Sequence, residues 1–316
     1  IHQAIIESNP LALPAHSRAS AAKNAKSVFE YLDCDSDDVA CMRTKSYEDI
    51  LVAQKEAPKL DLRNLFINFQ TFSPMVDPNQ GPVRRQPFYD FQDGNFPPMN
   101  LMAGTVSEEG WLFVMELFTK PMSKAAYDGT IRMLFGSRSI KKEVLDMYPY
   151  DLVNEDEDDG RNVLNVLGTD LLFFCPLRNA TRGFQANQAG AADPIYLYRF
   201  AQLIQEDIWE PSNPYCVGHV CHGSELPFVF NIWTDGKDHN YDITDDEDKL
   251  QQSMISAWAN FMHTGNPNQG DSIMGQMPNY AAGEDTVALI QSPGWTTVSQ
   301  FRKEQCDMWD RVGYYW

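Results

Sequence analysis

The sequence has few basic residues and no long hydrophobic run. Its 25 lysines and arginines are outnumbered by 44 aspartates and glutamates, so the formal net charge is −19. Because a surface of this charge repels polyanions, it disfavours binding to nucleic acids and to anionic lipid heads. The densest apolar run, at 171–174, is far shorter than the roughly 18 residues that a membrane-spanning helix requires. We therefore expect no nucleic-acid partner and no membrane span.

Metal-binding cysteine spacings of the Cys-x-x-Cys type are also absent, although the chain has six cysteines. Their even number, the acidic composition and a glycosylation sequon at Asn179 favour paired disulfides in a secreted or endomembrane protein. The alternative is a cytosolic protein whose cysteines are reduced and buried. The sequence starts at Ile1 without a methionine or a signal peptide, so we expect a processed chain or a part of a longer one.

Strand and helix patterns alternate along the chain, which predicts an α/β fold. The expected strands cover 1–8, 100–106 and 194–200, and the expected helical segments cover 17–32, 108–118 and 250–262, the last opened by a capping box at Thr244 and Glu247. Residues 72–99 are rich in Pro, Gly, Asn and Gln, and we expect them to be irregular. The acidic turn at 154–160 lacks the register of an EF-hand calcium loop.

The stretch CVGHVCHGSELPFVF, residues 216–230, places two histidines and two cysteines within seven positions. Its pattern is open to three interpretations: a metal site, a disulfide-pinned loop, or the position of a catalytic histidine. Metal binding is disfavoured because Cys216, His219, Cys221 and His222 share one loop, whereas tetrahedral sites normally use two separated pairs. A histidine followed by glycine is, on its own, more often an ordinary loop residue than a catalyst.

A second stretch, GTVSEEG at 104–110, places a glutamate before a glycine directly after an expected strand. Glycine after the functional residue lets the backbone turn sharply, so that the preceding side chain can project into a cleft. A histidine and a carboxylate presented in this way make up two thirds of a nucleophile–base–acid triad. The pair predicts a hydrolytic site that still requires a nucleophile.

Several stretches resemble the type-B carboxylesterase family, which includes cholinesterases, lipases and neuroligins. Sequence blocks similar to those of the family are AWANFMHTGNPN (257–268), HGSELPFVF (222–230), GTVSEEGWLF (104–113) and IHQAIIESNP (1–10), in the last of which Asn9 replaces the usual glycine. The resemblance covers essentially all of the chain in the right order. It implies an α/β-hydrolase fold, in which helices flank a mostly parallel central sheet.

The resemblance implies catalytic roles for two residues. His222 would be the general base, and Glu109 would be the acid that orients it. Glu109 is preferred to Glu108 because it is the glutamate adjacent to Gly110. His219 would be a bystander, and no cofactor or metal is required.

The resemblance also implies two disulfides, Cys34–Cys41 in a small loop and Cys175–Cys306 over a long range. Cys216 and Cys221 fall outside the family pattern. We expect them to form a local disulfide that stiffens the loop carrying His222, and the alternative is two free thiols.

The Gly-x-Ser-x-Gly motif that carries the family's nucleophile is absent, and so is the Gly-Gly segment of the oxyanion hole. Ser107 and Ser224 lie close to Glu109 and His222 in sequence but lack the paired glycines. In the family both missing elements precede the strand that residues 1–8 resemble. We therefore expect residues 1–316 to be one portion of a domain, the C-terminal half of an α/β-hydrolase. A missing N-terminal half or a partner chain would complete the sheet, because an open hydrophobic strand edge favours aggregation.

Two functions follow from this interpretation. The first is a serine carboxyl-ester hydrolase that acts on a small ester or lipid-like substrate once the N-terminal part supplies Gly-x-Ser-x-Gly. The second is a catalytically silent relative used for binding, adhesion or structural assembly, as neuroligins are. The presence of both His222 and Glu109 favours the hydrolase. The oligomeric state stays open.

Overall fold

The computed structural model describes residues 2–57, 65–153, 158–187, 194–205, 208–234, 241–270 and 274–315. Its strands are β1 (Gln3–Glu7), β2 (Asn100–Val106), β3 (Ile195–Phe200), β4 (Val287–Ile290) and β5 (Thr296–Val298). Its α-helices are α1 (Arg18–Tyr31), α2 (Val39–Met42), α3 (Tyr47–Glu56), α4 (Leu65–Asn68), α5 (Pro87–Asp93), α6 (Glu109–Leu117), α7 (Lys124–Leu134), α8 (Arg138–Met147), α9 (Gly160–Gly168), α10 (Cys175–Asn187), α11 (Leu226–Phe230), α12 (Asp245–Thr264) and α13 (Lys303–Val312). A π-helical segment (Thr169–Phe174) joins α9 to α10, and a short 3-10 turn (Pro214–Cys216) precedes α11.

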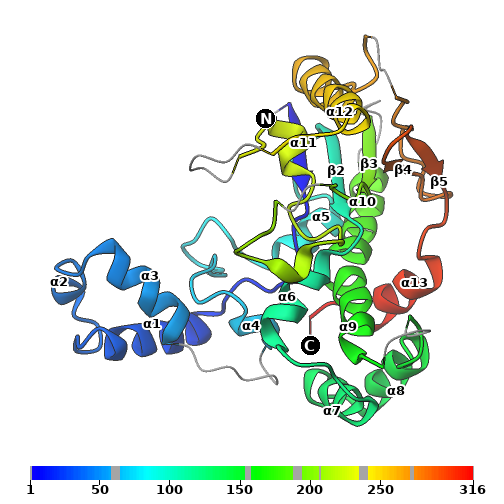
Figure 1. Ribbon diagram of the computed structural model, residues 1–316. Coiled ribbons are helices and arrows are strands. Elements are labelled where there is room, and N and C mark those ends of the chain that lie inside the picture. Colours follow the sequence, from blue (N-terminus) through cyan, green and yellow to red (C-terminus); the bar gives the residue numbers. More distant parts are fainter. Residues whose placement is uncertain are drawn as a thin grey trace.

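A mixed sheet runs through the described part of the molecule in the order β1-β2-β3-β4-β5 (Figure 1). The first four strands are parallel and β5 is antiparallel to β4. In the register, Gln3 lies opposite Asn100, and Leu101 lies opposite Ile195. This α/β arrangement confirms the predicted class. The strands expected at 1–8, 100–106 and 194–200 are β1, β2 and β3.

Both faces of the sheet are covered by helices, as parallel strands require. Alternate residues of β2 point to opposite faces: Leu101 and Ala103 join one apolar core, and Met102 and Val106 join the other. The first core includes side chains of α7, α9, α10 and α13. The second includes Leu250, Met254, Trp258 and Phe261 of α12, which share one helix face as their spacing predicts. The expected capping box opens this helix, since Thr244 and Glu247 exchange hydrogen bonds.

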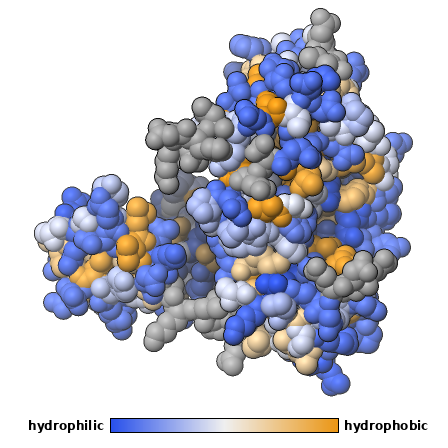
Figure 2. All heavy atoms as spheres, viewed as in Figure 1, coloured by the Kyte–Doolittle hydropathy of each residue, from blue (hydrophilic) through white to orange (hydrophobic). Residues whose placement is uncertain are grey.

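Helices α1, α2 and α3 form an arm that projects from the rest of the fold (Figure 1). The arm has its own small apolar core of Val28, Leu32 and Ala53. The Cys34–Cys41 disulfide links the end of α1 to α2. Figure 2 shows hydrophilic residues over most of the face in view, with apolar patches that include part of the arm.

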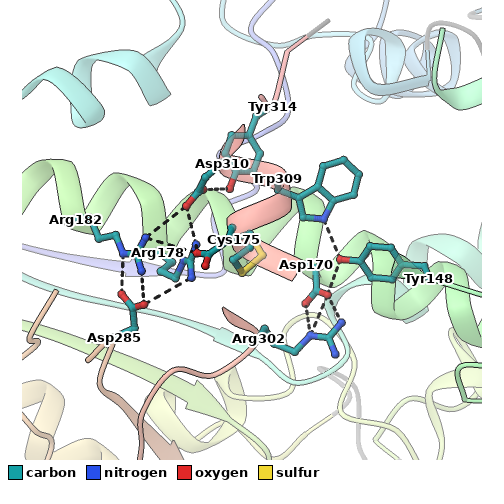
Figure 3. Close-up of a disulfide and its surroundings, with 12 residues drawn as sticks. Tyr148, Asp170, Cys175, Arg178, Arg182, Asp285, Arg302, Trp309, Asp310 and Tyr314 are labelled. Carbon is teal, nitrogen blue, oxygen red and sulfur yellow. Dashed lines mark hydrogen bonds and ion pairs between the residues drawn. A yellow bond between two sulfur atoms is a disulfide. The ribbon is translucent and has the colours of Figure 1, made fainter. Parts of the chain in front are cut away.

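The Cys175–Cys306 disulfide joins the start of α10 to α13 across 131 positions (Figure 3). Beside it, the Arg178 side chain is 1% exposed and contacts Asp307 at 2.8 Å and Asp310 at 2.6 Å. A buried guanidinium must be paired to offset its lost hydration, and the two carboxylates of α13 provide this pairing. The bridge and the ion pairs together attach the C-terminal helix to the core.

Residues 72–99 are not irregular throughout, as the sequence had suggested, because 87–93 form helix α5. Pro87 lies in the first turn, where a helix needs no N–H from it. Gly94 ends the helix with φ of +70°. Proline and glycine, which indicated a loop, act here as the start and stop signals of a short helix.

Part of the acidic turn, residues 154–157, lies outside the described residues. Within the residues that are described, no helix has both the length and the apolar character needed to cross a bilayer.

Candidate active site

Glu109 is placed at the junction where β2 ends and α6 begins. Its side chain has no exposed surface, and its Oε1 accepts the backbone N–H of Val106 at 2.8 Å. A carboxylate in the first turn of a helix is also stabilised by the helix dipole. Gly110 is required next, because a Cβ there would lie 2.5 Å from the carbonyl oxygen of Asn165 in α9. The Glu-Gly pair thus allows α6 to approach α9 while Glu109 turns inward.

His222 lies between the 3-10 turn and α11, at the end of a loop that we call the histidine loop (216–222). Cys216 and Cys221 form a disulfide that closes this loop. Gly223 follows with φ of +92°, a conformation that residues with a side chain rarely adopt. The disulfide and the glycine set the direction in which the imidazole leaves the backbone.

The structure brings His222 and Glu109 together although 113 positions separate them. His222 Nδ1 donates to Glu109 Oε2 at 2.5 Å, and the His222 side chain keeps 34% of its surface exposed. Because the carboxylate can only accept, Nδ1 carries the proton and Nε2 is left to act as a base. The rings of Phe113 and Phe173 lie 5.2 Å and 5.4 Å from the imidazole.

The electrostatics of His222 favour the protonated form. Burial acts to lower the pKa of His222, but the hydrogen bond and the negative charge of Glu109 outweigh burial. Glu225 contributes in the same direction, and the pKa of His222 therefore lies above 6.5. An imidazolium that forms when His222 takes a proton is stabilised in this site.

A third carboxylate, Glu225, lies close to the pair and was not predicted as a site residue. Burial and the charges of Glu109 and Glu7 raise its pKa to about 7. Ser8, at the end of β1, donates to Glu225 Oε1 at 3.3 Å. The only local sign that Glu225 belongs to the site is its position three residues after His222. Its contact with Ser8 joins segments that are far apart in sequence, so the sequence pattern does not reveal it.

Glu108, by contrast with its neighbour, does not contact His222. It binds His219 instead, with 2.9 Å between His219 Nδ1 and Glu108 Oε1. The sequence had suggested that His219 is a bystander, and no partner for it could be read from local pattern. The two adjacent glutamates thus pair with two histidines of one loop.

The structure also shows the positions of the cysteines, the serine and the asparagine that the sequence had singled out. The Sγ atoms of Cys216 and Cys221 are bonded to each other and are not free to bind a metal. The hydroxyl of Ser224 is buried and has no hydrogen-bond partner among the described residues. Asn179 lies in α10, where its Oδ1 accepts from Gln92 Nε2 at 3.1 Å. Its glycosylation stays a prediction.

Comparisons with known proteins give the site a context. A family model described as the carboxylesterase family matches residues 1–309. The crystal protein of Dictyostelium discoideum is 28% identical over 316 residues, which cover 99% of this chain and 55% of that protein. The acetylcholinesterase of Bungarus fasciatus is 26% identical over 306 residues, which cover 94% of this chain and 48% of the enzyme.

Among solved structures, PNB esterase superposes with a TM-score of 0.67 at 25% sequence identity. The match covers 98% of this chain and 57% of that structure. The chain thus spans about half the length of the proteins that it matches.

Proposed function

The chain belongs to the carboxylesterase family, and on this premise we propose that it is the C-terminal part of a serine carboxyl-ester hydrolase. It contributes the general base His222 and the orienting acid Glu109. An N-terminal part or a partner chain contributes the serine nucleophile and the oxyanion donors. The observation that carries the proposal is the 2.5 Å contact between His222 Nδ1 and a fully buried Glu109 Oε2.

The geometry allows one sequence of proton transfers. The serine hydroxyl attacks the ester carbonyl while His222 Nε2 takes its proton, and the imidazolium then returns that proton to the leaving alcohol. Water repeats the cycle on the acyl-enzyme, with His222 again as the base. Throughout, Glu109 keeps the Nδ1–H in place and stabilises the positive charge on the ring.

The need for an additional part is supported by the edge of the sheet. Strand β1 pairs with β2 and with no other described strand, and all five of its residues are only partly buried. Its other edge exposes backbone hydrogen-bonding groups that a further strand would satisfy. We infer that the additional strand beside β1 carries the nucleophile motif at its end. This arrangement would place the serine beside His222.

The surroundings of His222 suit an apolar acyl group. A small cavity of about 60 Å³ adjoins Phe113 and is lined by apolar side chains from α4, α6, α7, α9 and the π-helical segment. The apolar character of this lining favours the acyl group of a small ester or lipid-like substrate over a charged group, and the proposed chemistry requires no cofactor. Three disulfides favour a secreted or endomembrane location.

A second candidate is a catalytically silent role in binding or assembly. The name of the related crystal protein from Dictyostelium discoideum states no enzymatic activity, which favours this alternative. The paired His222 and Glu109 favour the hydrolase, since a silent protein has no need to keep a buried acid against an imidazole.

Ester hydrolysis by the intact protein, including its N-terminal part, separates the two candidates. We expect turnover of a para-nitrophenyl ester that is abolished by His222→Ala and kept by His263→Ala, which alters an exposed histidine of α12. Absence of turnover in a folded wild-type protein that carries the N-terminal part would favour the silent role.

A further inference from the structure

Two consecutive glutamates at the start of α6 contact the histidine loop at different points. Glu109 binds the imidazole of His222. Glu108 binds the residues just before it: its Oε1 contacts His219 Nδ1 at 2.9 Å, and its Oε2 accepts the N–H of Val220 at 2.8 Å. Both oxygens of Glu108 are therefore used to hold the loop that carries the base.

The backbone of Glu108 strengthens this attachment. Its N–H donates to the carbonyl oxygen of Val220 at 3.2 Å, and Glu108 and Cys221 form an isolated parallel bridge. Backbone pairing of this kind sets the register between the start of α6 and the loop. With Glu108 opposite Cys221, the next residues on each side are Glu109 and His222, the proposed acid and base.

His219 is itself held from a second side. The indole of Trp111, on the first turn of α6, stacks on the His219 ring with centroids 3.8 Å apart and planes 22° apart. Trp111 Nε1 donates to the carbonyl oxygen of Tyr215 at 2.6 Å, so the indole also holds the chain ahead of the loop. The His219 ring is therefore fixed by a carboxylate at its edge and an aromatic ring on its face.

Glu108 holds the loop as a charged group. Burial acts to raise the pKa of Glu108, but the hydrogen bonds from His219 and from the Val220 amide outweigh burial, and the pKa lies below 4.5. Hydrogen bonds to an ionised acceptor are about twice as strong as those between neutral groups. A glutamine at this position would present an N–H to one of two donors and lose that contact.

We propose that Glu108, acting through His219 and Val220, is a positioning residue that keeps His222 within reach of Glu109. The proposal rests on the proposed function, because it assigns a task to the residue beside the triad acid. Glu108 touches neither the imidazole of His222 nor, in this scheme, the substrate. Its effect is on where the base lies, and small displacements of a catalytic group reduce turnover steeply.

The test compares Glu108→Gln and His219→Ala with two matched controls in the intact protein. His219→Asn retains a side-chain N–H near the position of Nδ1, and Glu304→Gln removes an exposed carboxylate from α13. The measurements are kcat and KM for a para-nitrophenyl ester, the thermal unfolding midpoint, and the NMR resonance of the His222 Nδ1 proton.

We expect Glu108→Gln and His219→Ala to lower kcat by about 10- to 100-fold, with KM nearly unchanged and the His222 resonance shifted or broadened. His219→Asn and Glu304→Gln should resemble the wild type. If Glu108→Gln does not fold, His219→Ala carries the test. Variants that lose stability but keep kcat and the His222 resonance would overturn the positioning role. If the wild type has no esterase activity, the proposed function fails, and the His222 resonance alone still decides whether Glu108 positions the ring.

Discussion

At the scale of single residues, the candidate site combines a proposed base, His222, that is partly exposed with a proposed acid, Glu109, that solvent does not reach. Glu109 has no exposed surface, so water does not compete for its hydrogen bond to His222. The imidazole is 34% exposed, which leaves room for it to meet a hydroxyl group. The difference in exposure suits the two tasks, because the base must reach the reacting atoms and the acid need not.

Replacing Glu109 by glutamine tests the role of the acid. The amide removes the charge that stabilises the imidazolium and no longer enforces the tautomer with a proton on Nδ1. We expect kcat to fall by about 10³- to 10⁴-fold in the intact protein, with a small change in KM. Steady-state hydrolysis measures this, and Glu304→Gln, an exposed carboxylate in α13, is the control. A Glu109→Gln variant as active as the wild type would contradict the assignment.

The raised pKa of His222 predicts where activity is lost on acidification. The base must be neutral, so kcat/KM falls as the pH drops through the pKa of His222 in the free enzyme. Because that pKa lies above 6.5, the acidic limb should have its midpoint above pH 6.5. In Glu109→Gln the residual activity should show a midpoint at lower pH, since the group that outweighs burial is gone. A midpoint that is the same in the wild type and in Glu109→Gln would show that Glu109 does not act on His222 as described.

The sequence predicts some residues of the site and not others for a physical reason. Glu109 and His222 could be singled out because each directly precedes a glycine, a signal contained within a few adjacent residues. The contacts of Glu108 with His219 and of Glu225 with Ser8 cross 111 and 217 positions. Such contacts depend on how strands and loops pack, and no local pattern encodes them.

At the scale of elements, the histidine loop is attached to the β2–α6 junction and is closed by its own disulfide. The Cys216–Cys221 bridge spans a sequence separation of 5, and the Cys34–Cys41 bridge of the arm spans 7. The two bridges constrain the unfolded chain to nearly the same extent. They differ in location, since only the first lies beside His222.

Removing each bridge by paired serine substitutions separates stability from function. Loop-closure entropy predicts a loss of about 2 kcal/mol for either bridge. Only Cys216→Ser with Cys221→Ser should also lower kcat, because only that change loosens the histidine loop. Thermal unfolding and ester hydrolysis of the intact protein measure the two effects. Equal kcat values for the two double variants would show that the first bridge has no part in placing His222.

Elements with a strong local pattern were predictable, and those that depend on context were not. Strand β2 coincides with the predicted 100–106, and α12 begins at its predicted capping box. Helix α5 was missed because proline and glycine outweighed the short apolar pattern between them. The π-helical segment at 169–174 was missed because its apolar side chains are buried all round, which gives no periodicity to read.

At the scale of the whole molecule, the described residues form a packed core, and the proposed function requires a nucleophile from outside them. Both faces of the sheet are covered, and α13 is fastened by a disulfide and ion pairs (Figure 3). The β1 edge is open among the described strands, and Ser8 and Glu225 at its end are close to the proposed base. In the proposed function, one additional part would both pair with the edge of β1 and supply the serine next to His222.

The most direct test of the proposed function is to treat the intact protein with a serine-directed fluorophosphonate and to locate the label by mass spectrometry. We expect one labelled serine, within a Gly-x-Ser-x-Gly motif outside residues 1–316, and no labelling in His222→Ala. A label on a serine within residues 1–316, or a folded wild-type protein that takes no label, would contradict it.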